Sequence, residues 1–270
     1  MPRSISPDEI DLTARPTTAT NWFTLLLFFG GFVACAAVTV FVFIRFELYE
    51  LLDESPNLRA REQAERIGSA IKSYVRATRR WPASKSTDAI GKPLLSWRVH
   101  LLPHIGQQEL YEKFQLSEPW DSPHNSALIA SMPGVYRNKG FRLESGRTCW
   151  LAIIGPDSVI TREPIRDGKM AAGIRPKMIT DNRNLTMVVV ETDPPGVIWT
   201  QPSDYEYSDD NLPRPFGNSR DNHSLFAINA EGLHVSLSNE FDDTSLRSLF
   251  TRSRGEQVDV IQKQVEDRRR

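Results

Sequence analysis

The amino-acid sequence predicts an α+β protein in which a membrane-spanning helix precedes one folded domain. Three observations predict this class: an uncharged stretch over residues 23–44, helical spacing of apolar residues over 58–79, and short strand-like runs separated by proline and glycine. We expect the second stretch to form a long amphipathic helix that continues from the span and packs on an antiparallel β-sheet. Short helices are expected early in the domain.

The first stretch is predicted to be a transmembrane helix over residues 22–46. At about 1.5 Å per residue, its uncharged part reaches about 33 Å, which is enough to cross the hydrocarbon of a bilayer. Trp22 and Arg45 border it, as an aromatic anchor and a cation that reaches the headgroups would. Residues 1–21 are polar and contain three prolines, so they are predicted to form a disordered arm.

A cleaved signal peptide is the main alternative for this stretch. Asp8, Glu9 and Asp11 stand where a signal peptide carries basic residues, and the apolar run continues well past the small residues 34–36. We therefore expect an uncleaved anchor that contacts the lipid bilayer.

The chain has a formal net charge of −1 and two cysteines. This balance leaves no basic surplus for a nucleic-acid backbone, so no nucleic acid is expected as a partner. Cys35 lies within the predicted span and Cys149 in the domain, so no internal disulfide is expected. Residues 47–251 are assigned to the domain and residues 252–270 to a charged tail.

The long helix of the domain is predicted to run from near residue 58 to about residue 79. Ser55 and Pro56 fit an N-cap and a first helical residue, and Trp81-Pro82 is expected to end the helix. Its candidate core positions recur at helical spacing: Ala64, Ile67, Ile71, Tyr74, Val75 and Thr78.

Shorter elements are expected to follow. Residues 107–114 and 122–131 are predicted to be helical, whereas residues 94–99 fit either a strand or the start of a helix. The predicted strands cover residues 148–154, 187–191, 225–229 and 233–237, with a hairpin turn over 229–233. The side chains expected to point inward from the sheet are Trp150, Val188, Phe226 and Val235.

Two clusters of potentially reactive residues are weak candidates for a site. His100 and His104 have the spacing of a metal-binding pair on a helix, but a proline lies between them and no further ligand is close in sequence. Asp121, Ser122 and His124 include the residue types of a catalytic triad, yet triads assemble from separate parts of a fold. A turn or helix capped by Asp121 is the better explanation.

Two acidic groupings complete the search. The stretch over residues 204–210 could hold a calcium ion through its carboxylates, although an exposed loop is the commoner outcome for such a stretch. His223 could form an acid–base pair with Asp221 or Glu231, but no nucleophile accompanies it. We therefore predict no catalytic residue, no cofactor and no metal site. The carboxylates of the acidic stretch are Asp204, Glu206, Asp209 and Asp210.

The middle of the chain is rich in tryptophan, which leaves a second function open. Trp97, Trp120, Trp150 and Trp199 could line a ligand site, or they could fill the core of a fold with short strands. We favour the core, and keep an anchored ligand- or ion-binding receptor module as the alternative function.

Several stretches together resemble the bacterial domain-of-unknown-function family 1559. The likeness covers roughly residues 61–257. Its specific stretches are residues 66–74 with Trp81-Pro82, LLSWRVHLLPHIGQQELYEKFQLSEPWDSPHN at 94–125, Met132-Pro133 with Val135-Tyr136, WLAIIGP at 150–156, residues 179–191, and VIWTQPSD at 197–204.

The resemblance implies a pilin-like N-terminal helix and a β-rich domain outside the cytoplasm. Three departures accompany it. Trp22 stands where most members carry the prepilin glycine, and Leu27 stands where they carry glutamate. Glu231-Gly232 likewise replaces a late Asp-Gly pair.

We therefore predict a single-pass, pilin-like envelope protein that has a structural or protein-interaction role and is not an enzyme. It is expected in the cell membrane, with most of the chain on the periplasmic side. Protein partners are expected, or self-association through the helix, where Gly30, Ala34 and Ala37 form a stripe of small residues.

Overall fold

The computed structural model describes residues 38–42, 56–138, 141–167, 170–214, 224–238 and 241–255. The chain divides into two compact units, Met1–Asp53 and Glu54–Arg270. The predicted arm, most of the predicted span, residues 47–55 and the tail beyond residue 255 lie outside the described residues. Within the part that is described, no helix combines the length and the apolar character needed to cross a membrane.

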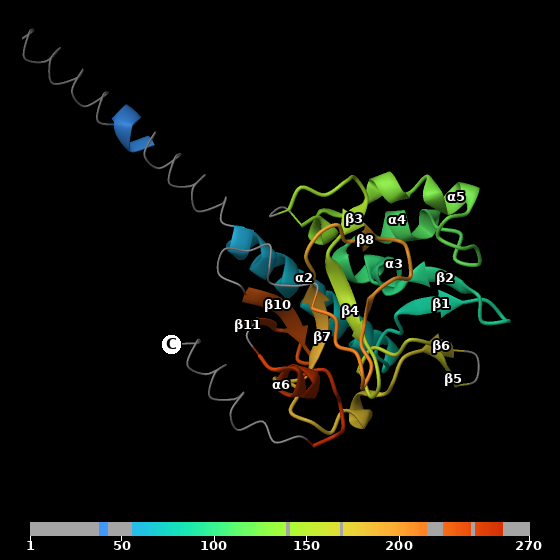
Figure 1. Ribbon diagram of the computed structural model, residues 1–270. Coiled ribbons are helices and arrows are strands. Elements are labelled where there is room, and N and C mark those ends of the chain that lie inside the picture. The colour runs from blue at the N-terminus through green and yellow to red at the C-terminus, as the bar shows by residue number, and fades with distance from the viewer. Residues whose placement is uncertain are drawn as a thin grey trace, which may run out of the picture. The chain divides into compact units, whose positions relative to one another are not determined.

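Helix α2 (Pro56–Thr78) confirms the predicted long helix (Figure 1). Its apolar face is buried, with Ala64, Ile67 and Ile71 fully covered. The helix ends at Thr78 rather than at Trp81-Pro82, because Arg79 adopts a left-handed backbone conformation with φ 59°. The hydroxyl of Thr78 donates to the carbonyl of Tyr74 at 2.9 Å or to that of Arg80 at 2.9 Å, so it satisfies carbonyl groups at this terminus.

A five-stranded sheet forms the other half of the core (Figure 1). Its order is β11 (His234–Ser238), β10 (Ser224–Asn229), β7 (Met187–Glu191), β4 (Trp150–Ile154) and β9 (Tyr205–Glu206). The expectation of a purely antiparallel sheet is wrong at one edge, where β9 runs parallel to β4. Parallel strands need a long connection, which the chain between the end of β4 and the start of β9, residues 155–204, provides.

Both faces of this sheet are covered. Trp150, Val188 and Phe226 belong to the hydrophobic cluster that contains the buried face of α2, as expected. Val235 is also buried, but it belongs to the cluster on the opposite face, with residues of helix α6 (Asp243–Ser248). Val235 pairs in register with Ala227, and neighbouring residues of a strand point to opposite faces, so it cannot share a face with Phe226.

The predicted short elements are present with altered boundaries. Residues 94–99 contain both a strand end and a helix start, and residues 122–131 divide into two short helical segments. Residues 148–154 divide into two strands at Cys149. The remaining elements are β1 (Lys85–Thr87), β2 (Pro93–Ser96), α3 (Trp97–His100), η1 (Leu102–Ile105), α4 (Gln108–Lys113), α5 (Pro123–Ser126), η2 (Ile129–Ser131), η3 (Gly134–Tyr136), β3 (Arg147–Thr148), β5 (Ile165–Asp167), β6 (Met170–Ala172), η4 (Pro176–Met178) and β8 (Val197–Ile198).

Two glycines allow α2 to approach the β10–β11 hairpin. The predicted turn is confirmed by a hydrogen bond from the amide of Asn229 to the carbonyl of Leu233 at 3.0 Å. A Cβ atom at Gly68 would lie 2.3 Å from the carbonyl oxygen of Gly232, and Gly232 itself has φ 70°. No larger residue fits at Gly68 without a backbone shift, which fixes where the helix crosses the hairpin.

Candidate functional site

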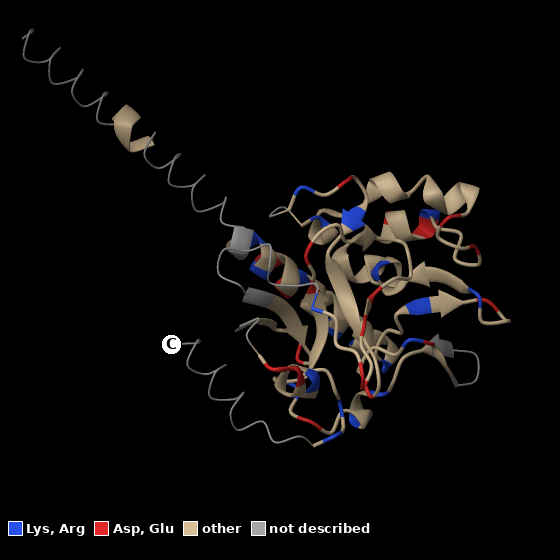
Figure 2. Cartoon of the chain, in the orientation of Figure 1, with Lys and Arg blue, Asp and Glu red and all other residues tan. Residues whose placement is uncertain are grey.

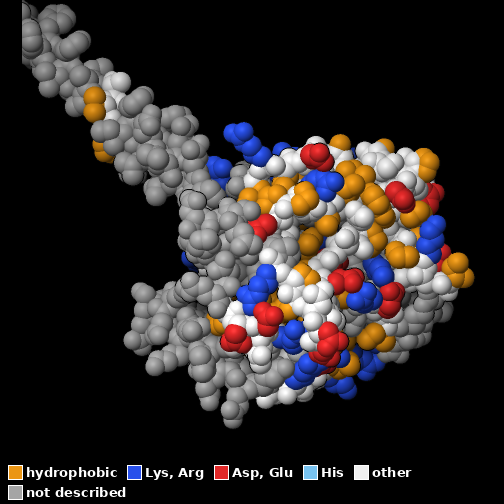
Figure 3. All heavy atoms as spheres, viewed as in Figure 1, with side chains coloured by type: hydrophobic (Ala, Val, Ile, Leu, Met, Phe, Trp, Pro, Cys, Tyr) orange, Lys and Arg blue, Asp and Glu red, His pale blue; other side chains and the backbone are white. Residues whose placement is uncertain are grey.

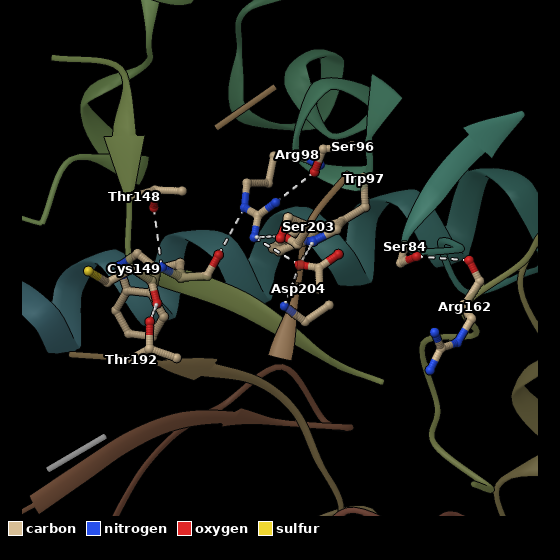
Figure 4. Close-up of polar contacts among 12 residues, drawn as sticks. Ser84, Ser96, Trp97, Arg98, Thr148, Cys149, Arg162, Thr192, Ser203 and Asp204 are labelled. Atoms are coloured by element: carbon tan, nitrogen blue, oxygen red, sulfur yellow. Dashed lines mark hydrogen bonds and ion pairs between the residues drawn. The ribbon is translucent and has the colours of Figure 1, made fainter. Parts of the chain in front are cut away.

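A buried ion pair between Arg98 and Asp204 is the most elaborate polar site that the structure describes (Figure 4). Arg98 lies on the short helix α3, which begins where β2 ends, and Asp204 directly precedes β9. The Nη2 atom of Arg98 lies 2.8 Å from Oδ1 of Asp204, and the two side chains are 0% and 1% exposed. The pair therefore joins two segments that are far apart in sequence.

The other two guanidinium nitrogens of Arg98 also donate hydrogen bonds. Nε donates to the carbonyl of Trp150 at 2.9 Å, and Nη1 donates to the hydroxyl of Ser96 at 2.7 Å. Ser96 is the N-cap of α3, and its hydroxyl also accepts from the amide of Arg98. The guanidinium carbon lies 4.9 Å from the ring centre of Trp97. This arrangement orients the planar group from several sides.

Oδ1 of Asp204 accepts two further hydrogen bonds. The donors are Nε1 of Trp97 at 3.0 Å and the amide of Ala152 on β4 at 2.9 Å. Burial raises the pKa of the Asp204 carboxyl, whereas the charge of Arg98 and the Trp97 and Ala152 donors lower it. Burial lowers the pKa of Arg98, and Asp204 opposes that effect. The pair therefore fastens α3 and β4 to the start of β9, and its closure to solvent leaves no room for a substrate.

A second buried polar group lies near the start of β4. The side-chain amide of Asn138 donates to Oε1 of Glu191 at 2.6 Å, and its oxygen accepts from the amide of Cys149 at 2.7 Å. The amide of Thr192 donates to the carbonyl of Cys149 at 2.8 Å. Figure 4 shows Cys149 between Thr148 and Thr192, where it is enclosed. These contacts bridge the break between β3 and β4.

His100 and His104 make different contacts in the structure. Burial lowers the pKa of His100 to about 4, and its ring meets that of Tyr111 edge-on at 6.4 Å. Nδ1 of His104 lies 3.0 Å from the hydroxyl of Ser73, and its ring meets Tyr74 edge-on at 5.5 Å. Within the described residues no group of three or more potential metal ligands is found.

The residues that resemble a triad organise a turn. Ser122, rather than Asp121 as predicted, is the N-cap of α5, because its hydroxyl accepts from the amide of Asn125 at 3.1 Å. Asn125 is buried, and its side chain accepts from the amide of Gln115 and donates to the carbonyls of Gln115, Glu118 and Pro119. Nε2 of His124 lies 2.7 Å from the carbonyl of Lys113. Asn125 was not singled out from the sequence.

The acidic stretch is dispersed rather than gathered. Asp204 points inward, Glu206 pairs with Arg162 at 2.9 Å, and Asp209 pairs with Arg254 at 3.1 Å. His223 and Asp221 lie outside the described residues, and Glu231 lies 3.9 Å from Arg183.

The tryptophans are core residues. Trp97, Trp150 and Trp199 are fully buried in one hydrophobic cluster, and Trp120 packs against it partly exposed. The rings of Trp199 and Tyr136 are stacked, with 6.0 Å between their centroids. These rings therefore pack against one another rather than line a binding site.

A shallow groove of about 380 Å³ lies between α2 and η1. Its lining consists of Glu65, Arg66, Ser69, His104 and Ile105. Glu65 forms an exposed ion pair with Arg61 at 2.9 Å, so this side of the groove is open to solvent.

The comparisons with known proteins identify a family for the chain. A family model described as "Protein of unknown function (DUF1559)" matches residues 59–210. The chain belongs to this family. The DUF1559 match covers α2 through β9, so it includes both partners of the Arg98–Asp204 pair, whereas the β10–β11 hairpin lies beyond it. Neither a curated protein nor a solved structure matches the chain.

Proposed function

We propose that this protein is a single-pass, pilin-like component of the cell envelope that acts by contacting other proteins. Residues 38–42 carry the proposal. They are helical, they lie within the apolar stretch 23–44, and Val38, Val40, Phe41 and Val42 are between 56% and 62% exposed. Exposed apolar side chains on a helix favour a lipid environment or a partner helix.

The second unit supports a contact role rather than a chemical one. Its most elaborate polar site, the Arg98–Asp204 pair, is closed to solvent and joins structural elements. Among the described candidates, His104, His124, Glu206 and Asp209 are held in local contacts. What remains for function is the outer surface of the folded unit.

We propose that the folded unit lies outside the cytoplasm. The basic residues are split closely between the two sides of the span, with Arg3 and Arg15 before it and Arg45, Arg59 and Arg61 after it. The resemblance to pilin-like family members favours the periplasmic side. A compartment-dependent reporter fused after Arg270 tests this, and activity of a reporter that works only in the cytoplasm overturns it.

Cross-linking of the full chain in its membrane tests the contact role. We expect cross-linked species larger than the monomer that persist after mild detergent extraction. A protein that stays monomeric and without partners under both conditions contradicts the proposal.

An anchored receptor is the second candidate, and the α2–η1 groove is the observation that favours it. Its opposite charges at Glu65 and Arg66 suit a small zwitterionic or ionic ligand. A thermal-shift screen of the full chain in detergent against metals and metabolites tests the idea. Stabilisation that Arg66→Ala abolishes supports it, and the absence of any stabilisation removes it.

A further inference from the structure

A basic surface surrounds the C-terminal end of α2. Residues 72–80 contain four cations and no acidic residue, and residues 173–178 add Arg175 and Lys177, again without an acid. The two segments are adjacent, because the amide of Trp81 donates to the carbonyl of Ile174 at 2.9 Å and the amide of Gly173 donates to the carbonyl of Trp81 at 2.8 Å. The basic surface consists of Arg76, Arg79, Arg80, Arg175 and Lys177.

The helix dipole accounts for only part of this surface. Cations at the C-terminal end of a helix interact favourably with its last carbonyls. This effect explains the presence of Arg76, Arg79 and Arg80. Arg175 and Lys177 come from a different segment around η4, and both are exposed. Two unrelated segments therefore bring positive charge to one place, although the whole chain has a net charge of −1.

Four acidic residues lie close together on a different part of the folded unit. Glu109 and Glu112 are exposed on α4, and Glu118 and Asp121 follow in the next loop, with Lys113 the cation between them. Figure 2 shows red segments on α4 and on the loop after it. The acidic surface consists of Glu109, Glu112, Glu118 and Asp121.

The acidic surface is rigid and adjoins apolar side chains. Asn125 holds the loop through its bonds to Gln115, Glu118 and Pro119. Figure 3 shows orange side chains gathered over the upper part of the visible face, and Leu116 of this loop is 39% exposed. Rigid charge beside partly exposed apolar area is typical of a protein-contact surface.

We propose that the basic surface of one copy docks on the acidic surface of a second copy. In Figure 1, α4 and α5 lie at the top of the unit and the short η4 segment at the bottom, so one copy cannot join its own two surfaces. A contact between two different surfaces is heterologous and propagates from copy to copy into a chain or a ring. This inference rests on the proposed contact role and names its partner.

Charge reversal in the full chain, purified in detergent micelles, tests the docking. Sedimentation velocity is expected to detect self-association at about 0.05 M salt that weakens at least about tenfold at about 0.5 M, where the screening length is only a few ångströms. Arg76→Glu/Arg79→Glu and Glu109→Lys/Glu112→Lys are each expected to abolish it. The four substitutions combined exchange the signs of residues 76 and 79 with those of residues 109 and 112, so they are expected to recover part of the association that each double variant loses.

A matched control carries the same change of charge elsewhere. Arg137→Glu/Arg142→Glu reverses two exposed cations outside both surfaces and is expected to associate like the unchanged chain. Intrinsic fluorescence checks that each variant is folded. If one reversal disturbs folding, the other reversal and the salt dependence of the unchanged chain still test the docking.

Two outcomes overturn the docking. Association that survives both reversals and high salt comes from the apolar stretch, and a chain that stays monomeric at low salt has no such contact. If a monomeric chain binds anionic vesicles through the basic surface, lipid is its partner instead. In either case, cross-linked species in the membrane would still support the proposed contact role. Failure of the docking can therefore be told apart from failure of the proposed function.

Discussion

Removal of the charge of Arg98 is expected to destabilise the folded unit strongly. Arg98→Met leaves the 1%-exposed Asp204 side chain without its cation, with only Trp97 and Ala152 as donors to Oδ1. Breaking a buried ion pair on one side costs about 3–5 kcal/mol. That is a large part of the roughly 5–15 kcal/mol by which domains are stable.

Guanidinium unfolding followed by tryptophan fluorescence measures this loss, because Trp97, Trp150 and Trp199 are buried in the core. With a slope of about 4 kcal/mol per M, the midpoint is expected to fall by roughly 1 M. The double variant Arg98→Met/Asp204→Leu leaves no unpaired charge. It is expected to be less destabilised than the two single variants summed, by about 2 kcal/mol.

A surface pair in the same unit provides the control. Arg162 and Glu206 are 53% and 52% exposed and lie 2.9 Å apart, so Arg162→Met is expected to cost no more than about 1 kcal/mol. If Arg98→Met costs no more than Arg162→Met, the assignment of Arg98 as the fastening of α3 to β4 and β9 is refuted.

Three further predictions concern stability. Gly68→Ala places a Cβ atom 2.3 Å from the Gly232 carbonyl oxygen and is expected to cost roughly 1–3 kcal/mol, whereas Gly134→Ala meets open space and is expected to change little; equal unfolding midpoints would contradict this. Because burial lowers the pKa of His100 to about 4, its neutral form is favoured in the folded state. Its contribution to stability is complete above the unfolded pKa of about 6.5 and is lost as the pH falls toward 4, by up to about 1.4 kcal/mol per pH unit. His100→Phe should reduce that dependence and leave the part that His234 supplies, because burial lowers the pKa of His234 to about 4 as well; an unchanged slope would contradict the role given to His100. Asn125→Ala removes the bonds that hold residues 115–119 and is expected to speed limited proteolysis there, with unchanged cleavage as the contrary result.

The local part of the fold could be predicted from the sequence. Helix α2, strand β7 and the β10–β11 hairpin follow from apolar spacing and turn residues within a short window, and all three are present. The end of α2 at Thr78 lies within one residue of the predicted end, although the left-handed conformation of Arg79, which the residue type does not indicate, terminates the helix before Trp81-Pro82. The face of Val235 follows from strand alternation, and a sheet that is covered on both faces explains why it is nevertheless buried.

Contacts between residues far apart in the chain could not be predicted from local sequence patterns. The acidic composition of residues 204–210 predicts an exposed loop, but Asp204 is buried by a partner 106 positions away in the chain. The signal for that partner was present in the sequence, since Arg98 is the one charged residue in the largely apolar run over residues 94–99. The parallel pairing of β9 with β4 likewise depends on where the chain returns, which no local pattern encodes.

Alkaline carbonate extraction of membranes that contain the full chain tests the proposed anchor most directly. The account predicts that the unchanged chain stays in the membrane pellet. Val40→Arg/Phe41→Arg, which places two charges in the apolar helical stretch, is predicted to move it into the wash. Complete release of the unchanged chain into the wash would contradict the anchor and, with it, the envelope role proposed for the folded unit.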